Sequence, residues 1–168
     1  MEATDPETIK AIVNNIVDGV ITINNQGIIK SVNKATEKIF GYAVEEMIGQ
    51  NVKMLMPEPD AGKHDGYINN YERTGNAKII GKGREVTGKK KSGETFPLFL
   101  SISEVVIKEE KIYAGIIHDL SDLKRTEVAL QESEDKINSI INAAVDGVIT
   151  IDNRGLIEMV NPSAARLF

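Results

Sequence analysis

An internal repeat limits what this chain can fold into. Residues 9–40 and 137–168 align without a gap at an offset of 128, and half of the 32 paired positions are identical. The segment Val-Asp-Gly-Val-Ile-Thr-Ile occurs at Val17–Ile23 and again at Val145–Ile151. The repeating unit is therefore about 128 residues long, so the 168-residue chain holds one complete unit and the first quarter of a second. We expect it to be part of a longer tandem protein.

Charge and residue content exclude several classes of function. The net charge of −5 argues against nucleic acid as the main partner. No apolar run approaches the ~18 residues of a transmembrane helix, and the acidic start is unlike a signal peptide. We therefore expect a cytoplasmic protein with no membrane contact in this part. Without cysteine there are no disulfides or thiolate sites, and two histidines, His64 and His118, are too few for an all-histidine two-metal site.

The complete unit predicts strands at both ends and helices between them. Asn33 and Gly41 are suited to begin and end one helix, and Asp60 to cap another. Helical spacing covers residues 9–17, 34–40, 44–48 and 60–73. Strand patterns cover residues 20–23, 28–32, 79–87, 96–102 with 105–107, and 112–117, with a turn at 88–93. The order indicates an α+β fold, a five-stranded antiparallel sheet with short helices on one face, and such a cup can hold a ligand.

A long connector helix is predicted over residues 120–144, about 36 Å at 1.5 Å per residue. Leu123, Leu130 and Ile137 repeat every seven residues, whereas Glu127 and Glu134 interrupt the partner positions. A weak two-stranded coiled coil and a single linker helix with a solvated face both remain open.

Short motifs of the complete unit carry a family likeness. They are Asp18-Gly19, the Asn33-capped helix ending in Phe40-Gly41-Tyr42, Glu45-Glu46-Met47-Ile48-Gly49 and Asp119-Leu120-Ser121. With these motifs residues 5–123 resemble a PAS domain, the sensory module of bacterial signalling proteins. The resemblance implies a PAS sensor domain at 1–123, a signalling helix at 120–144 and the first part of a second PAS repeat at 137–168.

A narrower likeness covers residues 50–104. The stretches from Gln50 to Tyr71 and from Ile79 to Ser101 are similar to the haem-binding PAS domain of the FixL oxygen sensors. This resemblance implies haem b as cofactor and His64 as the proximal iron ligand. It implies that Arg84 hydrogen-bonds a haem propionate or bound oxygen, with Ile79, Leu100 and Ile102 as apolar distal residues. Where the FixL pattern has further basic residues, this chain has Asn70 and Lys78.

The spacing around His64 is compatible with a ligand role. His64, Tyr67, Ile68 and Tyr71 fall at i, i+3, i+4 and i+7, so they share one helix face. A neutral imidazole among apolar groups suits haem iron, although a surface histidine or one already hydrogen-bonded in the core would share the spacing.

Arg84 lies in a predicted strand with Gly81 and Gly83. A buried guanidinium needs an anion, which a propionate or a polarised dioxygen would supply. The alternatives are that Arg84 faces solvent or pairs with Glu85 or Glu104.

We therefore expect a haem-based sensor of oxygen or another diatomic gas, without catalysis of its own. The signal would pass through Asp119-Leu120-Ser121 into the connector helix and on to an effector such as a histidine kinase. A homodimer through helices and PAS surfaces is expected. The alternative is a cofactor-free PAS module for dimerisation and signal relay. The expected cofactor-binding residues, with His64 alone on the metal, are His64, Tyr67, Ile68, Tyr71, Lys78, Ile79, Arg84, Leu98, Leu100 and Ile102.

The 32 residues of the second repeat are too few to build a core, because domains below ~40 residues rarely fold unaided. Val148, Ile149, Ile151, Ile157 and Val160 would lack a sheet to pack in. We expect this hairpin to pack against another chain or copy, or to be poorly ordered.

Overall fold

The computed structural model describes residues 5–74, 81, 83–107 and 110–167. The chain divides into two compact units, Met1–Ser121 and Asp122–Phe168. Among the described residues, no helix is both long enough and apolar enough to span a bilayer.

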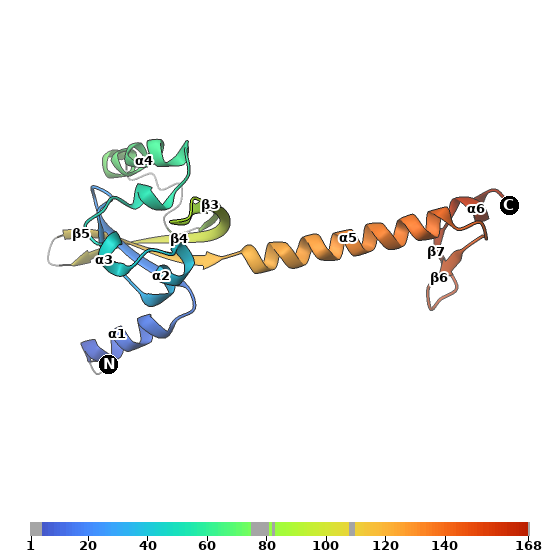
Figure 1. The fold of residues 1–168 in the computed structure, drawn as a ribbon, viewed down its shortest axis with the longest axis horizontal. Helices are drawn as coiled ribbons and strands as arrows, with labels where there is room; N and C mark the ends of the chain where they lie inside the picture. The colour runs from blue at the N-terminus through green and yellow to red at the C-terminus, as the bar shows by residue number, and fades with distance from the viewer. Residues whose placement is uncertain (1–4, 75–80, 82, 108–109, 168) are drawn as a thin grey trace. The chain divides into compact units, whose positions relative to one another are not determined.

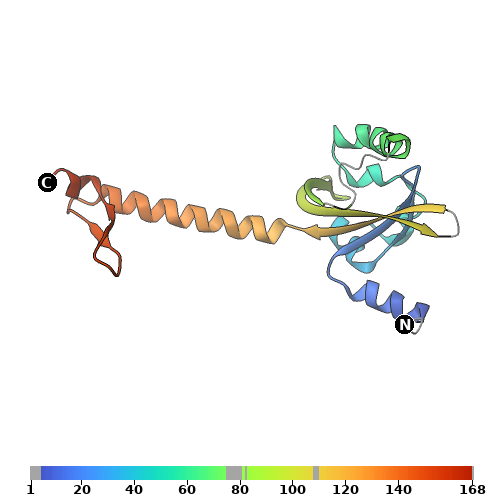
Figure 2. The ribbon, with the colours of Figure 1, turned by 180° about the vertical axis from the view of Figure 1, so that it is seen from behind.

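The first unit is built on a five-stranded antiparallel sheet (Figure 1). Its spatial order is β2-β1-β5-β4-β3, so the first and last strands of this unit are neighbours, with β5 at the centre. Figures 1 and 2 show α4 above this sheet from both sides. The strands are β1 (Gly19–Asn24), β2 (Ile29–Val32), β3 (Arg84–Lys89), β4 (Thr95–Ile107) and β5 (Glu110–Asp119). The predicted α+β architecture is confirmed.

Short helices connect β2 to β3, as the apolar spacing predicted. Asn33 caps α2 by accepting from the Thr36 N–H at 3.0 Å, and Gly41 ends it in the left-handed conformation. The helix α1 precedes β1 and has no fully buried residue. The helices are α1 (Pro6–Asn15), α2 (Lys34–Phe40), α3 (Val44–Met47), the 3₁₀ helix η1 (Val52–Leu55) and α4 (Asp60–Thr74).

The hydrophobic core lies between α2, α3 and η1 and the inner face of the sheet. Phe40 and Phe96 meet edge to face with ring centroids 5.4 Å apart. Alternate residues of β4 supply the sheet side, because side chains of a strand alternate between its faces. The buried cluster consists of Ile21, Ile29, Phe40, Met47, Val52, Leu55, Phe96, Leu98 and Ile117.

The third strand differs from its prediction. Residues 79, 80 and 82 lie outside the described residues, Gly81 and Gly83 precede the strand at positive φ, and β3 begins at Arg84. It continues through Gly88 and Lys89, which were predicted to be in the turn. A Cβ on Gly88 would stand 2.6 Å from Leu98 Cδ2 and 2.8 Å from Phe96 Cε1. The missing side chain therefore lets β3 pair closely over two buried residues.

The second unit repeats the beginning of the first. It comprises α5 (Ser121–Ala143, from the last residue of the first unit), β6 (Ile149–Ile151), β7 (Ile157–Val160) and α6 (Pro162–Ala165). The connector helix is thus confirmed. Val145 is 92% and Ile157 64% exposed, as expected for a hairpin without the rest of its sheet. Which partner covers these residues stays a prediction.

Candidate functional site

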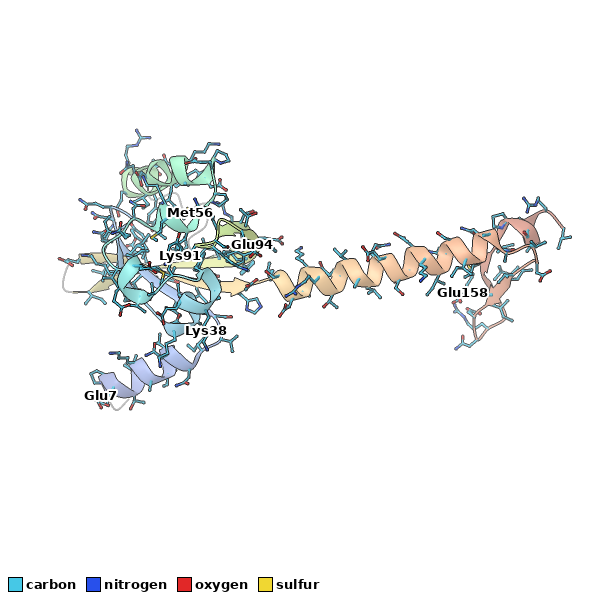
Figure 3. The ribbon with its side chains drawn as sticks, viewed as in Figure 1. Glu7, Lys38, Met56, Lys91, Glu94 and Glu158 are labelled. Carbon is cyan, nitrogen blue, oxygen red and sulfur yellow. The ribbon has the colours of Figure 1, made fainter. Side chains whose placement is uncertain are left out.

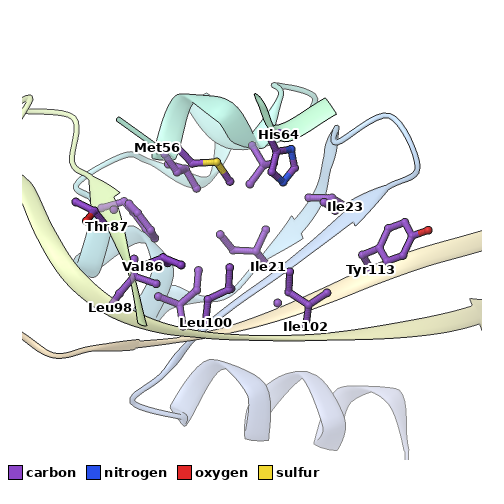
Figure 4. Close-up of a pocket in the computed structure, with 16 residues that line it drawn as sticks. Ile21, Ile23, Met56, His64, Val86, Thr87, Leu98, Leu100, Ile102 and Tyr113 are labelled. Atoms are coloured by element: carbon purple, nitrogen blue, oxygen red, sulfur yellow. The ribbon is translucent and has the colours of Figure 1, made fainter. Parts of the chain in front are cut away.

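A cavity of about 620 Å³ separates α4 from the sheet. This is within the ~300–1,000 Å³ typical of small-molecule and cofactor sites. The helix contributes His64, Tyr67, Ile68 and Tyr71. The opposite wall contains Leu100 and Ile102 of β4, together with Ile23, Val86 and Tyr113 from the neighbouring strands (Figure 4).

A smaller recess of about 80 Å³ continues this cavity toward the core. It shares His64, Met56 and Leu100 with the larger space and reaches Leu98 and Phe40. In Figure 4, Met56 and His64 lie above, and Leu98, Leu100 and Ile102 lie along the strands below. The two walls thus leave a largely hydrocarbon-lined gap for a ligand.

The helical spacing of α4 places four residues along the cavity, on the shared face that the sequence predicted. His64, Tyr67, Ile68 and Tyr71 all line the cavity, and no residue of α4 is fully buried. The predicted cap is wrong: Asp60 is already inside the helix, and Glu58 Oε2 instead accepts from the Gly62 N–H at 3.2 Å. The helix therefore begins without using the Asp60 side chain in that role.

His64 combines burial with an unsatisfied ring nitrogen. Its Nδ1 is buried and has no hydrogen-bond partner within the described part of the chain. Burial lowers the pKa of His64, Asp65 opposes this shift, and Lys53 reinforces it. Lys53 Nζ lies 2.5 Å from Asp65 Oδ2, so much of the acidic neighbour's charge is neutralised. The result is a neutral imidazole, the form that binds a metal. No cluster of three or more potential metal ligands exists among the described residues.

Arg84 lies at the solvent-exposed side of the cavity, opposite Leu100 in the β3–β4 register. Of the alternatives left open by the sequence, the structure has Arg84 facing solvent and not buried, because β3 only begins at this residue. Within the described chain Arg84 has no ion pair, and Glu104 instead lies 3.9 Å from Lys111. A cation at the mouth of the cavity can meet an anionic group of a ligand without a buried-charge penalty.

The remaining predicted site residues differ in where the structure places them. Leu100 and Ile102 line both spaces, while Leu98 lines only the deeper recess. Lys78 and Ile79 lie outside the described residues.

Sequence reasoning missed several wall residues, among them Met56, Ile23, Val86, Thr87 and Tyr113. A sequence signal was present for Ile23, whereas Tyr113 reaches the wall through its pairing with Ile23 in the β1–β5 register. Ile23 is two residues from the buried Ile21, and strand residues two apart share a face.

A group of polar side chains, here called the rim cluster, joins the last turn of α4 to the sheet. Its members are Tyr71 and Glu72 of α4, Glu104 of β4, and Lys111 and Tyr113 of β5. The Tyr113 hydroxyl donates to Glu72 Oε1, and Lys111 Nζ lies 3.4 Å from Glu72 Oε2. The Tyr113 hydrogen bond lowers the pKa of Glu72, and burial, more than any other cause, raises the pKa of Tyr113. The Tyr71 and Tyr113 rings pack edge to face at 6.1 Å.

A five-stranded antiparallel sheet in the order 2-1-5-4-3, with helices enclosing a cavity over one face, is the PAS fold. The chain belongs to the PAS domain family, whose models match residues 17–122 and, for the second repeat, residues 135–168.

Solved PAS domains share the fold. One from Colwellia psychrerythraea aligns with a TM-score of 0.58 at 19% identity, covering 69% of this chain and 97% of that one. The PAS domain of an HTR-like protein from Haloarcula marismortui gives 0.56 at 18% identity, covering 67% and 89%.

The chain is similar to parts of much longer curated signalling proteins. Sensor protein FixL of Bradyrhizobium diazoefficiens is 43% identical over 129 residues, 77% of this chain and 26% of that protein. A probable serine/threonine-protein kinase of Dictyostelium discoideum is 38% identical over 149 residues, covering 89% and 9%. The cell-division control histidine kinase PdhS of Brucella ovis is 26% identical over 147 residues, covering 88% and 14%. The chain thus spans about a quarter or less of each relative, and its likeness to a FixL-type PAS domain is confirmed.

Proposed function

We propose that the first unit is a gas-sensing PAS domain that binds haem b through His64. The observation that carries this proposal is the buried, unpartnered Nδ1 of His64 in a hydrocarbon-lined cavity. A buried polar atom is usually hydrogen-bonded, so an unpaired one on a side chain that lines a cavity suggests that a partner is missing. The 43% identity to Sensor protein FixL supports the same assignment.

The residues around the cavity fit such a cofactor. His64 would hold the metal, Leu100, Ile102 and Ile68 would pack against the macrocycle, and Arg84 at the mouth would meet a propionate. Bound haem would supply an iron centre able to take up oxygen or another diatomic gas. Lys78 and Ile79 keep their expected roles beside a propionate and on the distal side. Asn70 also lines the cavity and offers a hydrogen bond instead of a charge.

The end of β5 offers a route for the signal. Asp119 Oδ1 accepts from the Ser121 N–H at 2.8 Å and from its hydroxyl at 2.5 Å. The Leu120 N–H donates to the Pro97 carbonyl at 3.0 Å, which ties this segment to β4. A shift of the cavity-lining strands would therefore also displace the residues at which α5 begins. We propose that α5 carries it to an effector, such as a histidine kinase, outside the described chain.

A hemin titration tests haem binding. We expect a Soret band in the wild-type protein and its loss or large shift in His64→Ala. His118→Ala is the matched control, because His118 is the other histidine of the chain. It is exposed, lies near the end of β5 and is hydrogen-bonded to Asp18. A missing band in the wild type, or the same band in His64→Ala, would show that the proposal is wrong.

The second candidate function is a cofactor-free PAS module for dimerisation and relay. The neutral Asn70 at the cavity favours this candidate, because the FixL pattern has a basic residue at that position. One cation fewer than in that pattern is then available to pair with the two haem propionates. It predicts a colourless protein after expression with ample haem, whereas the haem proposal predicts a coloured one.

A further inference from the structure

The helix that carries His64 is held above the sheet by a limited set of contacts. None of its 15 residues is fully buried, because a cavity lies beneath its apolar face. Such a helix cannot rely on core packing for its position. Its placement therefore depends on contacts near its two ends.

The contacts at the N-terminal half and at the last turn differ in kind. Near His64, Asp65 pairs with Lys53 of η1, and both side chains are partly exposed. At the last turn, Glu72 is held by two strand residues, the hydroxyl of Tyr113 and the ammonium of Lys111. Tyr113 is only 4% exposed and is anchored in the centre of the sheet, so it offers a fixed attachment point.

We propose that Glu72 is a positioning residue whose bond to Tyr113 fastens α4 to the sheet and thereby fixes His64 over the cavity. Glu72 lies about two turns beyond His64 on the same helix. A tilt of the last turn therefore also moves the turn that carries the His64 imidazole. Lys111 compensates the carboxylate charge, and Tyr71 also faces it. Glu104 lies 3.9 Å from Lys111 and is hydrogen-bonded to Tyr71. Breaking the bond would loosen the last turn of the helix, where the Lys111–Glu72 ion pair and the Tyr71–Tyr113 ring contact would remain.

The proposal extends to ligand exchange. The Tyr113 ring lines the cavity while its hydroxyl holds Glu72, so one residue touches both the ligand space and the fastening. A ligand that displaces Tyr113 would loosen α4, and a tight Glu72 bond would slow ligand escape. This second part rests on the proposed haem function, whereas the fastening of α4 does not.

Hydrogen exchange of the full chain, prepared without haem, tests the fastening. We expect amides of residues 60–74 to exchange roughly tenfold faster in Glu72→Gln and in Tyr113→Phe, as for the loss of one hydrogen bond to a charged group. Tyr113→Phe keeps the ring and removes only the donor. Glu72→Gln leaves a weaker, neutral acceptor and removes the charge, whereas Tyr113→Phe removes the donor. The double variant should therefore speed exchange by less than the product of the two single effects, because both changes act on the same bond.

Glu46→Gln is the matched control. Glu46 lies on α3 and not on α4, and its Oε1 also pairs with a lysine, Lys91, at 2.5 Å (Lys91 is labelled in Figure 3). It should leave exchange in residues 60–74 unchanged. Unchanged exchange in Glu72→Gln, or an increase spread evenly over the domain, would overturn the proposal. If Tyr113→Phe unfolds the domain, the partly exposed Glu72 carries the test alone.

A second measurement separates the two proposals. If hemin binds, its transfer to excess apomyoglobin should be several-fold faster from Glu72→Gln than from wild type or Glu46→Gln. Equal transfer rates with faster helix exchange would refute the role in ligand retention and leave the fastening. Absence of any hemin binding would refute the proposed function, while the exchange experiment would still decide on Glu72.

Discussion

At the scale of single residues, one asparagine organises the beginning of each repeat. Asn33 Nδ2 donates to the carbonyls of Val13 and Asp18, each at 2.9 Å, while its Oδ1 accepts from the Val20 and Thr36 N–H groups. Asn161 makes the corresponding bonds in the second unit, to the carbonyls of Ile141 and Asp146 and from the N–H groups of Val148 and Ala164. The sequence repeat is thus also a repeat of hydrogen bonding. The helix-cap role was predictable, but the three-way junction was not, because it joins separate segments.

The carboxylate of Glu72 gives a prediction about pH. Its pKa is lowered from 4.5, chiefly by the Tyr113 hydrogen bond, so its stabilising effect is present above pH 4.5 and is lost as pH falls through the lowered value. The raised pKa of Tyr113 keeps the donor protonated up to and beyond pH 10.0. We expect wild type to exceed Glu72→Gln in unfolding free energy by about 1 kcal/mol at neutral pH.

Urea unfolding across the pH range measures this difference. It should shrink toward zero in acid, where both variants carry a neutral side chain at position 72. A difference that is constant down to the most acidic pH would contradict the role of the charged carboxylate.

At the scale of elements, two glycines should respond oppositely to alanine. Gly66 lies inside α4 with no heavy atom within 4 Å of an added Cβ, so Gly66→Ala should stabilise the protein by roughly 0.5–1 kcal/mol. Gly88→Ala in β3 would place a Cβ 2.6 Å from Leu98 Cδ2 and should destabilise it by about 1–3 kcal/mol. Thermal or urea unfolding measures both changes. Changes of the same sign would contradict the packing described for these two elements.

How far the elements were predictable depends on how local their causes are. The helix at 34–40 follows from its caps, and the cavity-lining residues of α4 follow from helical spacing within one segment. The start of β3 at Arg84 and its continuation through Gly88 depend on pairing with β4 and on the size of Phe96 and Leu98. Tyr113 joined the cavity wall because of its register with β1, and such register is a property of the folded sheet.

At the scale of the whole molecule, exposed apolar residues support the expected homodimer. On α1, Ile9 and Ile12 are 50% and 56% exposed and lie three residues apart, so they share one face. On α5, Leu123 and Leu130 are 54% and 61% exposed. Sedimentation equilibrium should give twice the 18.4 kDa chain mass, and Ile12→Glu should shift the protein toward the monomer. A wild-type monomer at micromolar concentration would contradict this expectation.

The central position of β5 has a consequence for how the first unit is made. Translation produces Gly19 of β1 98 residues before Ile117, its partner in β5. Until then, the β2-β1 hairpin and the β3-β4 hairpin have no strand between them. Assembly of the sheet is therefore a late event that closes long loops, the situation in which folding is slow. A nascent chain halted before Glu110 would carry two unjoined hairpins and an open cavity floor.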